Sequence, residues 1–334
     1  DSRRNQLIHW LRSDLQLIFE DLEPASSDAS FRRYFRIHPS GETRIVMDAP
    51  PPGEDVRPFL KQASRLRTLG LLTPSIYGEN IDKGFLLMED FGTQSYLDVL
   101  KPENVDRLYG AALESLLLLA EAPESVTSDL ALYDRPLLER ELGIFEEWCL
   151  GAYLKIQVTA SERLMLHEAF EILVASALEQ PKVLVHRDFH SRNLMVLDKE
   201  APGILDFQDA VLGPLTYDPV SLLRDCYIEW PQAHVERWLE EHRKNLVLRG
   251  MISPELSAQQ FHRWFDLMGV QRHLKAIGIF TRLHLRDGKS SYLGDIPRTL
   301  RYVLDVAKKT TALSGLAEFL DAKLAPAFLK TPSP

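Results

Sequence analysis

The sequence predicts a two-lobed α+β fold, with a small N-terminal β-sheet lobe over residues 1–91 and a large, mainly helical C-terminal lobe over residues 92–334. Short β-branched and aromatic runs, broken by turn residues, dominate the first lobe. Long helical repeats of apolar residues begin near Ser95, and a strand-like block at 182–206 interrupts them. A chain of 334 residues with 45% hydrophobic and 26% charged positions has ordinary globular composition and enough length for two domains.

The elements of the first lobe follow in chain order. Leu7, Leu11 and Leu15 recur at helical spacing, which predicts a first helix within residues 1–21. The later segments are a loop, a β-hairpin with its turn at Pro39–Gly41, a helix and two more strands, at 25–30, 31–37 with 43–47, 56–69, and 75–77 with 84–88. Together they predict a small sheet with one crossing helix.

The second lobe is expected to be built from long amphipathic helices. Apolar residues recur at helical spacing over 105–122, 135–153 and 161–178, and again over most of 219–324. The interrupting block contains three short apolar runs, at 182–186, 193–197 and 203–206, with polar residues between them. This block is where candidate functional residues concentrate.

Charge and cysteine content exclude several classes of protein. The 39 Lys and Arg against 48 Asp and Glu give a net charge of −9, which disfavours general binding to nucleic acid or anionic lipid. The two cysteines form no C-x-x-C pair, so neither a disulfide framework nor a cysteine zinc site is indicated, and a reducing, cytoplasmic setting is expected. The densest apolar run, at 116–119, is far too short for a membrane span, and residues 1–21 are interpreted as a helix rather than a signal peptide.

The strand-like block carries a pattern suited to phosphoryl transfer. It reads His186-Arg-Asp188-Phe-His190-Ser-Arg-Asn193, then an apolar run, then Asp206-Phe207. Transfer from a nucleotide needs a carboxylate to accept the hydroxyl proton and oxygen ligands for magnesium. Asp188 would be the general base, while Asn193 and Asp206 would bind the metal. His190 and Arg192 lie close enough in sequence to reach the γ-phosphate.

This pattern resembles the aminoglycoside phosphotransferase and choline kinase family, which has a two-lobed protein-kinase-like fold. The hairpin, the following helix, Phe85–Asp90 and Tyr217–Pro219 occur in the family's order. The segments Ser27–Arg36, Val46–Pro50 and Gln271–Lys275 look like one branch, the bacterial kinases that phosphorylate the anomeric hydroxyl of N-acetylmuramate and N-acetylglucosamine in peptidoglycan recycling. The resemblance implies an ATP- and Mg²⁺-dependent kinase that makes an amino-sugar 1-phosphate from a small amino-sugar substrate. A monomer is expected.

The nucleotide site is expected at the junction of the lobes. The resemblance places adenine against Glu89 and Phe91, with Met88 lining its pocket. The strand at 44–48 lacks the lysine that usually grips the nucleotide phosphates, and Gln62 stands in place of the helix glutamate. Arg33 or Arg36 could replace the lysine, and the glycine-free loop would cover the phosphates with its backbone and the hydroxyls of Ser26, Ser27 and Ser30.

The acceptor site is less defined by sequence. The candidates for contact with substrate are Arg224, Asp225 and Arg272. A lactyl carboxylate could be bound by an anion pocket of Arg263, Arg272, His273 and Lys275, or these residues could be ordinary surface charges.

Other residues near the motif have structural interpretations. His186 is expected to support its turn, Asp218 to cap a helix that contains Pro219, and His234 and His242 to lie on a solvated helix face rather than at a metal.

Two alternatives to the amino-sugar kinase stay open: a kinase for another small alcohol, such as an aminoglycoside, choline or homoserine, and a catalytically inactive nucleotide-binding module.

Overall fold

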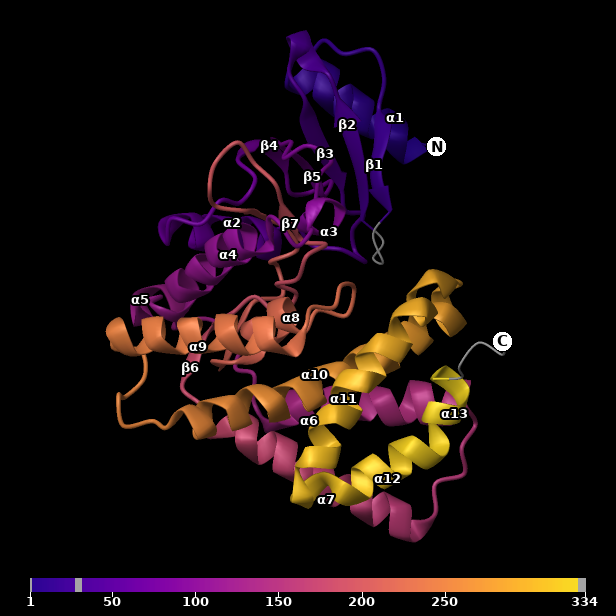
Figure 1. Ribbon diagram of the computed structural model, residues 1–334. Coiled ribbons are helices and arrows are strands. Elements are labelled where there is room, and N and C mark those ends of the chain that lie inside the picture. The colour runs from indigo at the N-terminus through magenta and orange to yellow at the C-terminus, as the bar shows by residue number, and fades with distance from the viewer. Residues whose placement is uncertain (1, 28–31, 330–334) are drawn as a thin grey trace. The chain divides into compact units, whose positions relative to one another are not determined.

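The computed structural model describes residues 2–27 and 32–329 and divides into two compact units (Figure 1). The first unit contains the chain up to Val99 together with Asn193–Asp209. The second contains Leu100–Arg192 and the chain from Ala210 onward. The division therefore falls inside the motif, between Arg192 and Asn193.

A five-stranded antiparallel sheet forms the first unit, in the order β1-β2-β3-β5-β4. Its strands are β1 (Glu23–Ser27), β2 (Arg33–Ile37), β3 (Arg44–Asp48), β4 (Ile76–Asn80) and β5 (Phe85–Glu89). The predicted hairpin is confirmed as β2 and β3, which pair from Arg33 with Asp48 to Ile37 with Arg44. The two further strands are confirmed as β4 and β5.

One expectation for the sheet was wrong. Residues 25–27 were expected in a loop but belong to β1, which pairs with β2 at the sheet edge, with a bulge between Pro24 and Ser26. Proline and serine have low strand propensity, yet an edge strand tolerates proline because one of its sides makes no ladder hydrogen bonds. The exposed edge of β2 decided this pairing, and the local sequence did not signal it.

The N-terminal helix covers one face of the sheet. It comprises α1 (Ser2–His9) and a π-helical turn at Trp10–Asp14. Leu7, Trp10 and Leu11 form one buried cluster with alternate residues of the strands, including Val46 and Leu87. The predicted crossing helix is α2 (Arg57–Thr68), whose Phe59 contacts the Phe207 ring at a centroid distance of 4.7 Å.

Residues 193–209 join the first unit through backbone hydrogen bonds. They form a short hairpin, β7 (Leu194–Met195) and β8 (Gly203–Ile204), and precede the second unit's β9. The Ile204 N–H donates to the Leu72 carbonyl at 2.7 Å, and the Val196 N–H donates to the Gln94 carbonyl at 2.9 Å. The first unit thus includes this hairpin and the short α3 (Tyr96–Val99), which the predicted division at 91/92 assigned to the other lobe.

The second unit is mainly helical, as predicted. Its helices are α4 (Val105–Ala120), α5 (Glu124–Thr127), α6 (Arg135–Ile144) continued by a π-helix at Phe145–Tyr153, α7 (Ala160–Leu178), α8 (Tyr217–Leu223), α9 (Gln232–Leu248), α10 (Ala258–Asp287), α11 (Ile296–Lys309), α12 (Ser314–Lys323) and α13 (Ala325–Phe328). It also contains a two-stranded sheet, β6 (Lys182–Val185) with β9 (Val211–Pro214). The predicted helices at 105–122, 135–153 and 161–178 are confirmed.

The long helix α10 is the centre of this unit and packs against α6, α7, α8 and α11 (Figure 1). Its N-cap is Ser257, whose hydroxyl accepts the Gln260 N–H, and it ends at Gly288 in the left-handed conformation. At Gly278 a Cβ atom would lie 2.7 Å from backbone atoms of Ile144 and Phe145. Only glycine permits this close approach of α10 to the end of α6.

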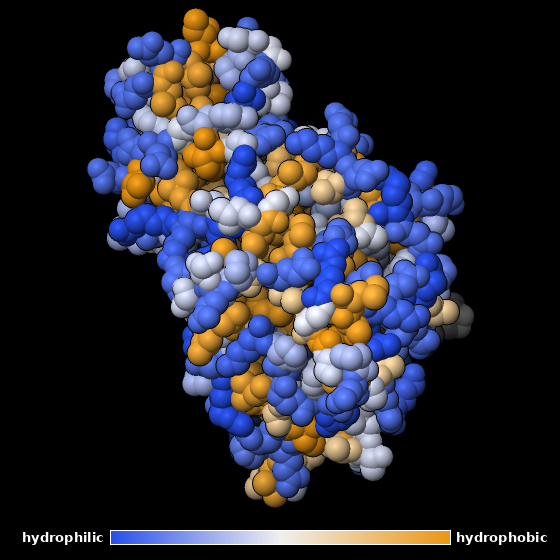
Figure 2. Space-filling view, turned by 90° about the vertical axis from the view of Figure 1, so that its left-hand side faces the viewer, coloured by the Kyte–Doolittle hydropathy of each residue, from blue (hydrophilic) through white to orange (hydrophobic). Residues whose placement is uncertain are grey.

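The surface carries no large apolar band on the face shown in Figure 2, where small hydrophobic areas are bordered by hydrophilic residues. Exposed large hydrophobic side chains, such as Ile18, Leu164 and Leu248, come from separate elements. Within residues 2–27 and 32–329, no helix is long and apolar enough to cross a membrane.

Candidate active site

The motif at 186–193 forms a loop that leaves β6 and enters the short hairpin. His186 is buried, accepts the Asp188 N–H at its Nδ1 over 3.2 Å, and packs edge-on against the buried Phe189 ring. Arg187 has a φ of +79°, a left-handed conformation that a non-glycine residue adopts only when its surroundings enforce it. The loop is therefore a constrained turn that presents Asp188.

Two buried carboxylates from the second unit hold the loop by its backbone. Asp218 accepts the N–H groups of His186 at 2.6 Å and Arg187 at 3.0 Å. Asp225 accepts the N–H groups of Ser191 and Tyr227, each at 2.8 Å. Because both anchors act on the main chain, the position of Asp188 is fixed from either side.

The helix-cap interpretation of Asp218 was wrong. α8 begins at Tyr217, so Asp218 lies inside its first turn, and the N-cap position is Thr216. The Asp218 carboxylate instead accepts hydrogen bonds from the 186–193 loop, where two backbone donors needed a buried acceptor. Burial raises the pKa of Asp218 to about 7.

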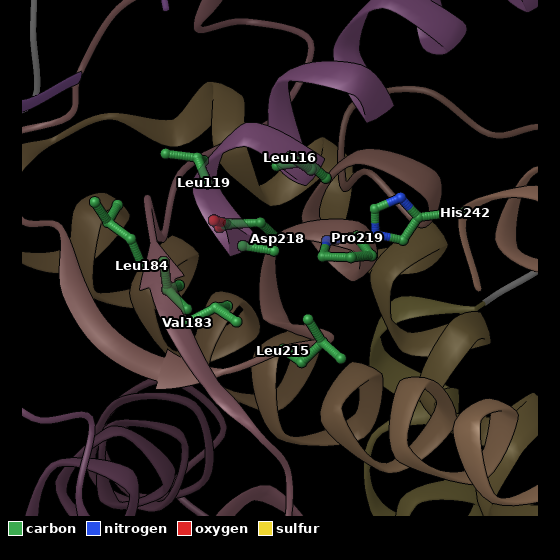
Figure 3. A pocket seen from close by; sticks show the side chains of 10 residues that line it. Leu116, Leu119, Val183, Leu184, Leu215, Asp218, Pro219 and His242 are labelled. Carbon is green, nitrogen blue, oxygen red and sulfur yellow. The ribbon is translucent and has the colours of Figure 1, made fainter. Parts of the chain in front are cut away.

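A small cavity adjoins Asp218 and His242 (Figure 3). Its volume is about 10 Å³, close to that of one water molecule, and leucine and valine side chains form much of its wall. Neither a sugar nor a nucleotide fits there. His242 is 2% exposed, so the expectation that it lies on a solvated helix face was wrong, because that face of α9 packs into the core.

Asp188 is partly buried among positive charges. Burial raises its pKa, but the positive charge of Lys275, followed by those of His190 and Arg272, outweighs burial and lowers the pKa below its ordinary value. Asp188 is therefore ionised at neutral pH, the state that a proton acceptor requires.

Behind the loop lies a buried ion network that the sequence analysis did not find. The Glu141 carboxylate of α6 is 2% exposed and pairs with Lys275 of α10 at 2.8 Å and with the guanidinium of Arg187. It also accepts a hydrogen bond from the Tyr133 hydroxyl. No local motif marks Glu141, because its partners come from distant parts of the chain.

The surface-charge alternative was wrong for three of the four residues at 263–275, and an anion pocket there stays a prediction. Arg272, His273 and Lys275 are at most 9% exposed, since they lie on the buried side of α10, whereas Arg263 pairs with Glu179 at the surface. Arg272 is nevertheless near enough to Asp188 for its charge to act on that carboxylate.

The other two predicted substrate residues also have structural partners. Arg224 donates to Asp266 at 2.7 Å and, with residues of α9, α10 and α11, lines a cavity of about 660 Å³. Asp225 accepts a hydrogen bond from the backbone N–H of Ser191 in the loop. Their contact with substrate stays a prediction.

His190 is buried and packs edge-on against the Tyr227 ring at 5.1 Å. Burial lowers the pKa of His190, so the imidazole is mostly neutral at pH 7. Its Nδ1 has no hydrogen-bond partner among the residues that the structure describes. A role for His190 beside Asp188 stays a prediction.

The two predicted magnesium ligands lie together in the first unit. The Asn193 amide approaches the Asp206 carboxylate at 3.4 Å, and Asp206 has a φ of +60°. Gln208, which the sequence analysis missed, donates to the other oxygen of Asp206 at 2.7 Å. Hard oxygen donors of this kind suit Mg²⁺, which keeps waters and phosphate oxygens in its remaining positions. No group of three or more His, Cys, Asp or Glu ligands exists within the described ranges.

The predicted nucleotide residues Met88, Glu89 and Phe91 lie at and just after the end of β5. Met88 is buried, the Glu89 carboxylate accepts from the N–H and hydroxyl of Ser75, and Phe91 packs directly over Gly203. Glu89 and Phe91 line a cavity of about 320 Å³.

The two arginines expected at the nucleotide phosphates are paired with carboxylates of the first unit. Arg33 pairs with the buried Asp48 at 2.5 Å, and Arg36 pairs with Asp90 at 2.5 Å. Ser27 ends β1, and Ser30 lies outside the described residues. Binding of phosphate by any of them stays a prediction.

This arrangement matches a known family over most of the chain. The model of the phosphotransferase enzyme family matches residues 21–251. The chain belongs to the phosphotransferase enzyme family. Among curated relatives of this phosphotransferase, the N-acetylmuramate/N-acetylglucosamine kinases of Pseudomonas putida and Pseudomonas aeruginosa are 43% and 44% identical, each match covering 96% of both chains.

Solved structures show the same fold. The complex of an aminoglycoside phosphotransferase with GDP and kanamycin aligns with a TM-score of 0.61 at 17% identity, covering 92% of this phosphotransferase and 99% of that chain. A choline kinase from Streptococcus pneumoniae aligns with a TM-score of 0.59 at 15% identity, covering 91% and 99%. The solved structures confirm the kinase-like fold, whereas the family match and the curated relatives confirm a phosphotransferase that acts on a hydroxyl acceptor.

Proposed function

We propose that this phosphotransferase transfers the γ-phosphoryl group of ATP, with Mg²⁺, to the anomeric hydroxyl of N-acetylmuramate or N-acetylglucosamine, as its relatives' names indicate for them. Such a product, an amino-sugar 1-phosphate, would serve peptidoglycan recycling. The observation that carries the proposal is Asp188, a carboxylate whose lowered pKa keeps it ionised and whose loop is anchored by Asp218 and Asp225.

Asp188 would accept the proton of the anomeric hydroxyl as its oxygen forms a bond to the γ-phosphorus. The bond between the γ-phosphorus and the bridging oxygen breaks, ADP leaves, and the proton passes from Asp188 to solvent. A bound Mg²⁺ would neutralise phosphate charge, and Asn193 and Asp206 would hold it. The ion pair between Arg187 and Glu141 would hold Arg187 in its left-handed conformation and so keep the position of Asp188 fixed during the reaction.

Phosphorus NMR of the protein with Mg-ATP and either sugar tests the proposal. We expect a sugar 1-phosphate resonance in the wild type and a turnover reduced by roughly 10²- to 10⁴-fold in Asp188→Asn, with folding retained. Choline, kanamycin and homoserine are the alternative acceptors, and a product from one of these alone would refute the amino-sugar assignment. ATP binding without any product would support the inactive module.

Asp206→Ala separates the metal role from the role of the base. We expect this variant to weaken binding of Mg-ATP, measured by calorimetry, because the metal loses a charged ligand. Asp188→Asn is the matched control and should bind Mg-ATP nearly as the wild type does. Unchanged Mg-ATP binding by Asp206→Ala would contradict the metal role.

A further inference from the structure

Arg192 lies at the end of the catalytic loop with its side chain 39% exposed. Its guanidinium carbon is 3.7 Å from the ring centroid of Tyr227 and 5.3 Å from that of Tyr292. Two aromatic faces thus hold a flat cation in place without using its N–H groups.

Among the residues that the structure describes, this guanidinium has no hydrogen-bond acceptor. Its ion pair with Asp295, at 3.9 Å, is too long for a hydrogen bond. Asp295 itself accepts from Arg298 at 3.3 Å. A guanidinium has five N–H donors in a planar fork that matches a carboxylate.

The Arg192 side chain adjoins the position of the proposed base. The Tyr227 ring that supports it also contacts the His190 ring, and the His190 N–H donates to the Asp188 carbonyl at 3.0 Å. Ring contacts thus link Arg192 through Tyr227 to His190, which is two residues from Asp188 in the chain. We place the other substituents of an acceptor whose hydroxyl reaches Asp188 beside these residues.

We propose that Arg192 binds the carboxylate of an acid-bearing acceptor and thereby determines acceptor preference. This inference rests on the proposed function. N-acetylmuramate carries a lactyl carboxylate that N-acetylglucosamine lacks, and the two sugars are otherwise alike. Of the other cations near Asp188, Arg272 and Lys275 are at most 9% exposed, and Lys275 is already paired with Glu141, whereas the Arg192 side chain is 39% exposed.

Steady-state kinetics of Arg192→Gln with both sugars test the inference. We expect kcat/KM for N-acetylmuramate to fall about 10- to 100-fold, mainly through KM, because a charge-assisted bidentate contact is lost. For N-acetylglucosamine, and for the KM of ATP, we expect less than about a 3-fold change, since neither uses the contact. Arg192→Lys should be intermediate because it keeps the charge but not the fork.

Arg301→Gln is the matched control. Arg301 is an exposed arginine of α11 that pairs with Glu229 at 3.2 Å, and its loss should leave the ratio of the two sugars unchanged. Equal losses for both sugars in Arg192→Gln, or a raised KM for ATP, would overturn the inference and assign Arg192 to the nucleotide or the fold. A wild type that phosphorylates neither sugar would instead refute the proposed function.

Discussion

Replacement of Glu141 by glutamine tests the buried ion network that pairs with Arg187 of the 186–193 loop. Glu141 and its partner Lys275 have side chains that are 2% and 11% exposed, and the guanidinium of Arg187 is 19% exposed. Glutamine has the same shape as glutamate but no charge. The substitution therefore leaves two largely buried cations facing each other without their shared anion.

The expected loss of stability follows from that burial. Removal of one partner of a buried ion pair costs about 3–5 kcal/mol, because the remaining charge stays desolvated. Glutamine can still accept one hydrogen bond, so we expect the lower end, about 3 kcal/mol. For a cooperative unit of roughly 200 residues this corresponds to a Tm lower by about 6–12 °C.

The pH dependence gives a second signature. Burial raises the pKa of Glu141, but the charges of Lys275 and Arg187 outweigh burial and lower it below 4.5. A carboxyl with a lowered folded-state pKa contributes stability above its unfolded value and loses it as the pH falls through the folded value. The difference between wild type and Glu141→Gln should thus be full at pH 7 and shrink only below about pH 4.5.

Urea unfolding followed by circular dichroism measures this difference, with Glu171→Gln as the matched control. Glu171 pairs with Arg135 at 2.8 Å, but both side chains are more than 40% exposed, so its loss should cost less than about 1 kcal/mol. If Glu141→Gln is as stable as Glu171→Gln at pH 7, the buried network does not stabilise the loop and the reasoning fails.

Three further predictions concern the loop, a buried histidine and the helix packing. Asp218→Asn puts an amide N–H₂ near the N–H groups of His186 and Arg187, where the wild type has an acceptor. We expect the free energy of unfolding in urea to fall by about 1–3 kcal/mol and kcat to drop clearly. Full activity would argue against positioning of the loop by Asp218. Burial lowers the pKa of His242 from 6.5 to about 4. The free energy of unfolding should therefore be highest above pH 6.5 and fall by up to about 1.4 kcal/mol per pH unit as the pH drops from 6.5 towards 4. His242→Gln should flatten that slope, and an unchanged slope would exclude His242 as its source. Gly278→Ala should destabilise the protein by about 1–3 kcal/mol in a thermal melt, because the new Cβ would clash with backbone atoms. Gly110→Ala in α4 has open space around it and should stabilise the protein. Similar effects of the two substitutions would contradict the packing argument.

Most of the fold could be predicted because its signals are local. Helical spacing of apolar residues and a turn at Pro39–Gly41 are properties of neighbouring positions, and α4, α7 and the β2–β3 hairpin formed where they were expected. β1 was missed because its pairing depends on the open edge of β2 and its own residues favour a loop. The grouping of 193–209 with the first unit likewise depends on hydrogen bonds to Leu72 and Gln94, which are remote in sequence.

The sequence by itself determined the identity and spacing of Asp188, Asn193 and Asp206, because the pattern for phosphoryl transfer lies within one short stretch of chain. Only the tertiary structure decided how that stretch is held. Asp218 lies 32 positions after His186, yet it accepts the hydrogen bond of that residue's backbone N–H. Glu141 lies 46 positions before Arg187, yet it neutralises the charge of that guanidinium. A buried backbone donor or a buried cation needs a partner close in space, and packing of the helices, rather than spacing along the chain, determines which carboxylate provides it.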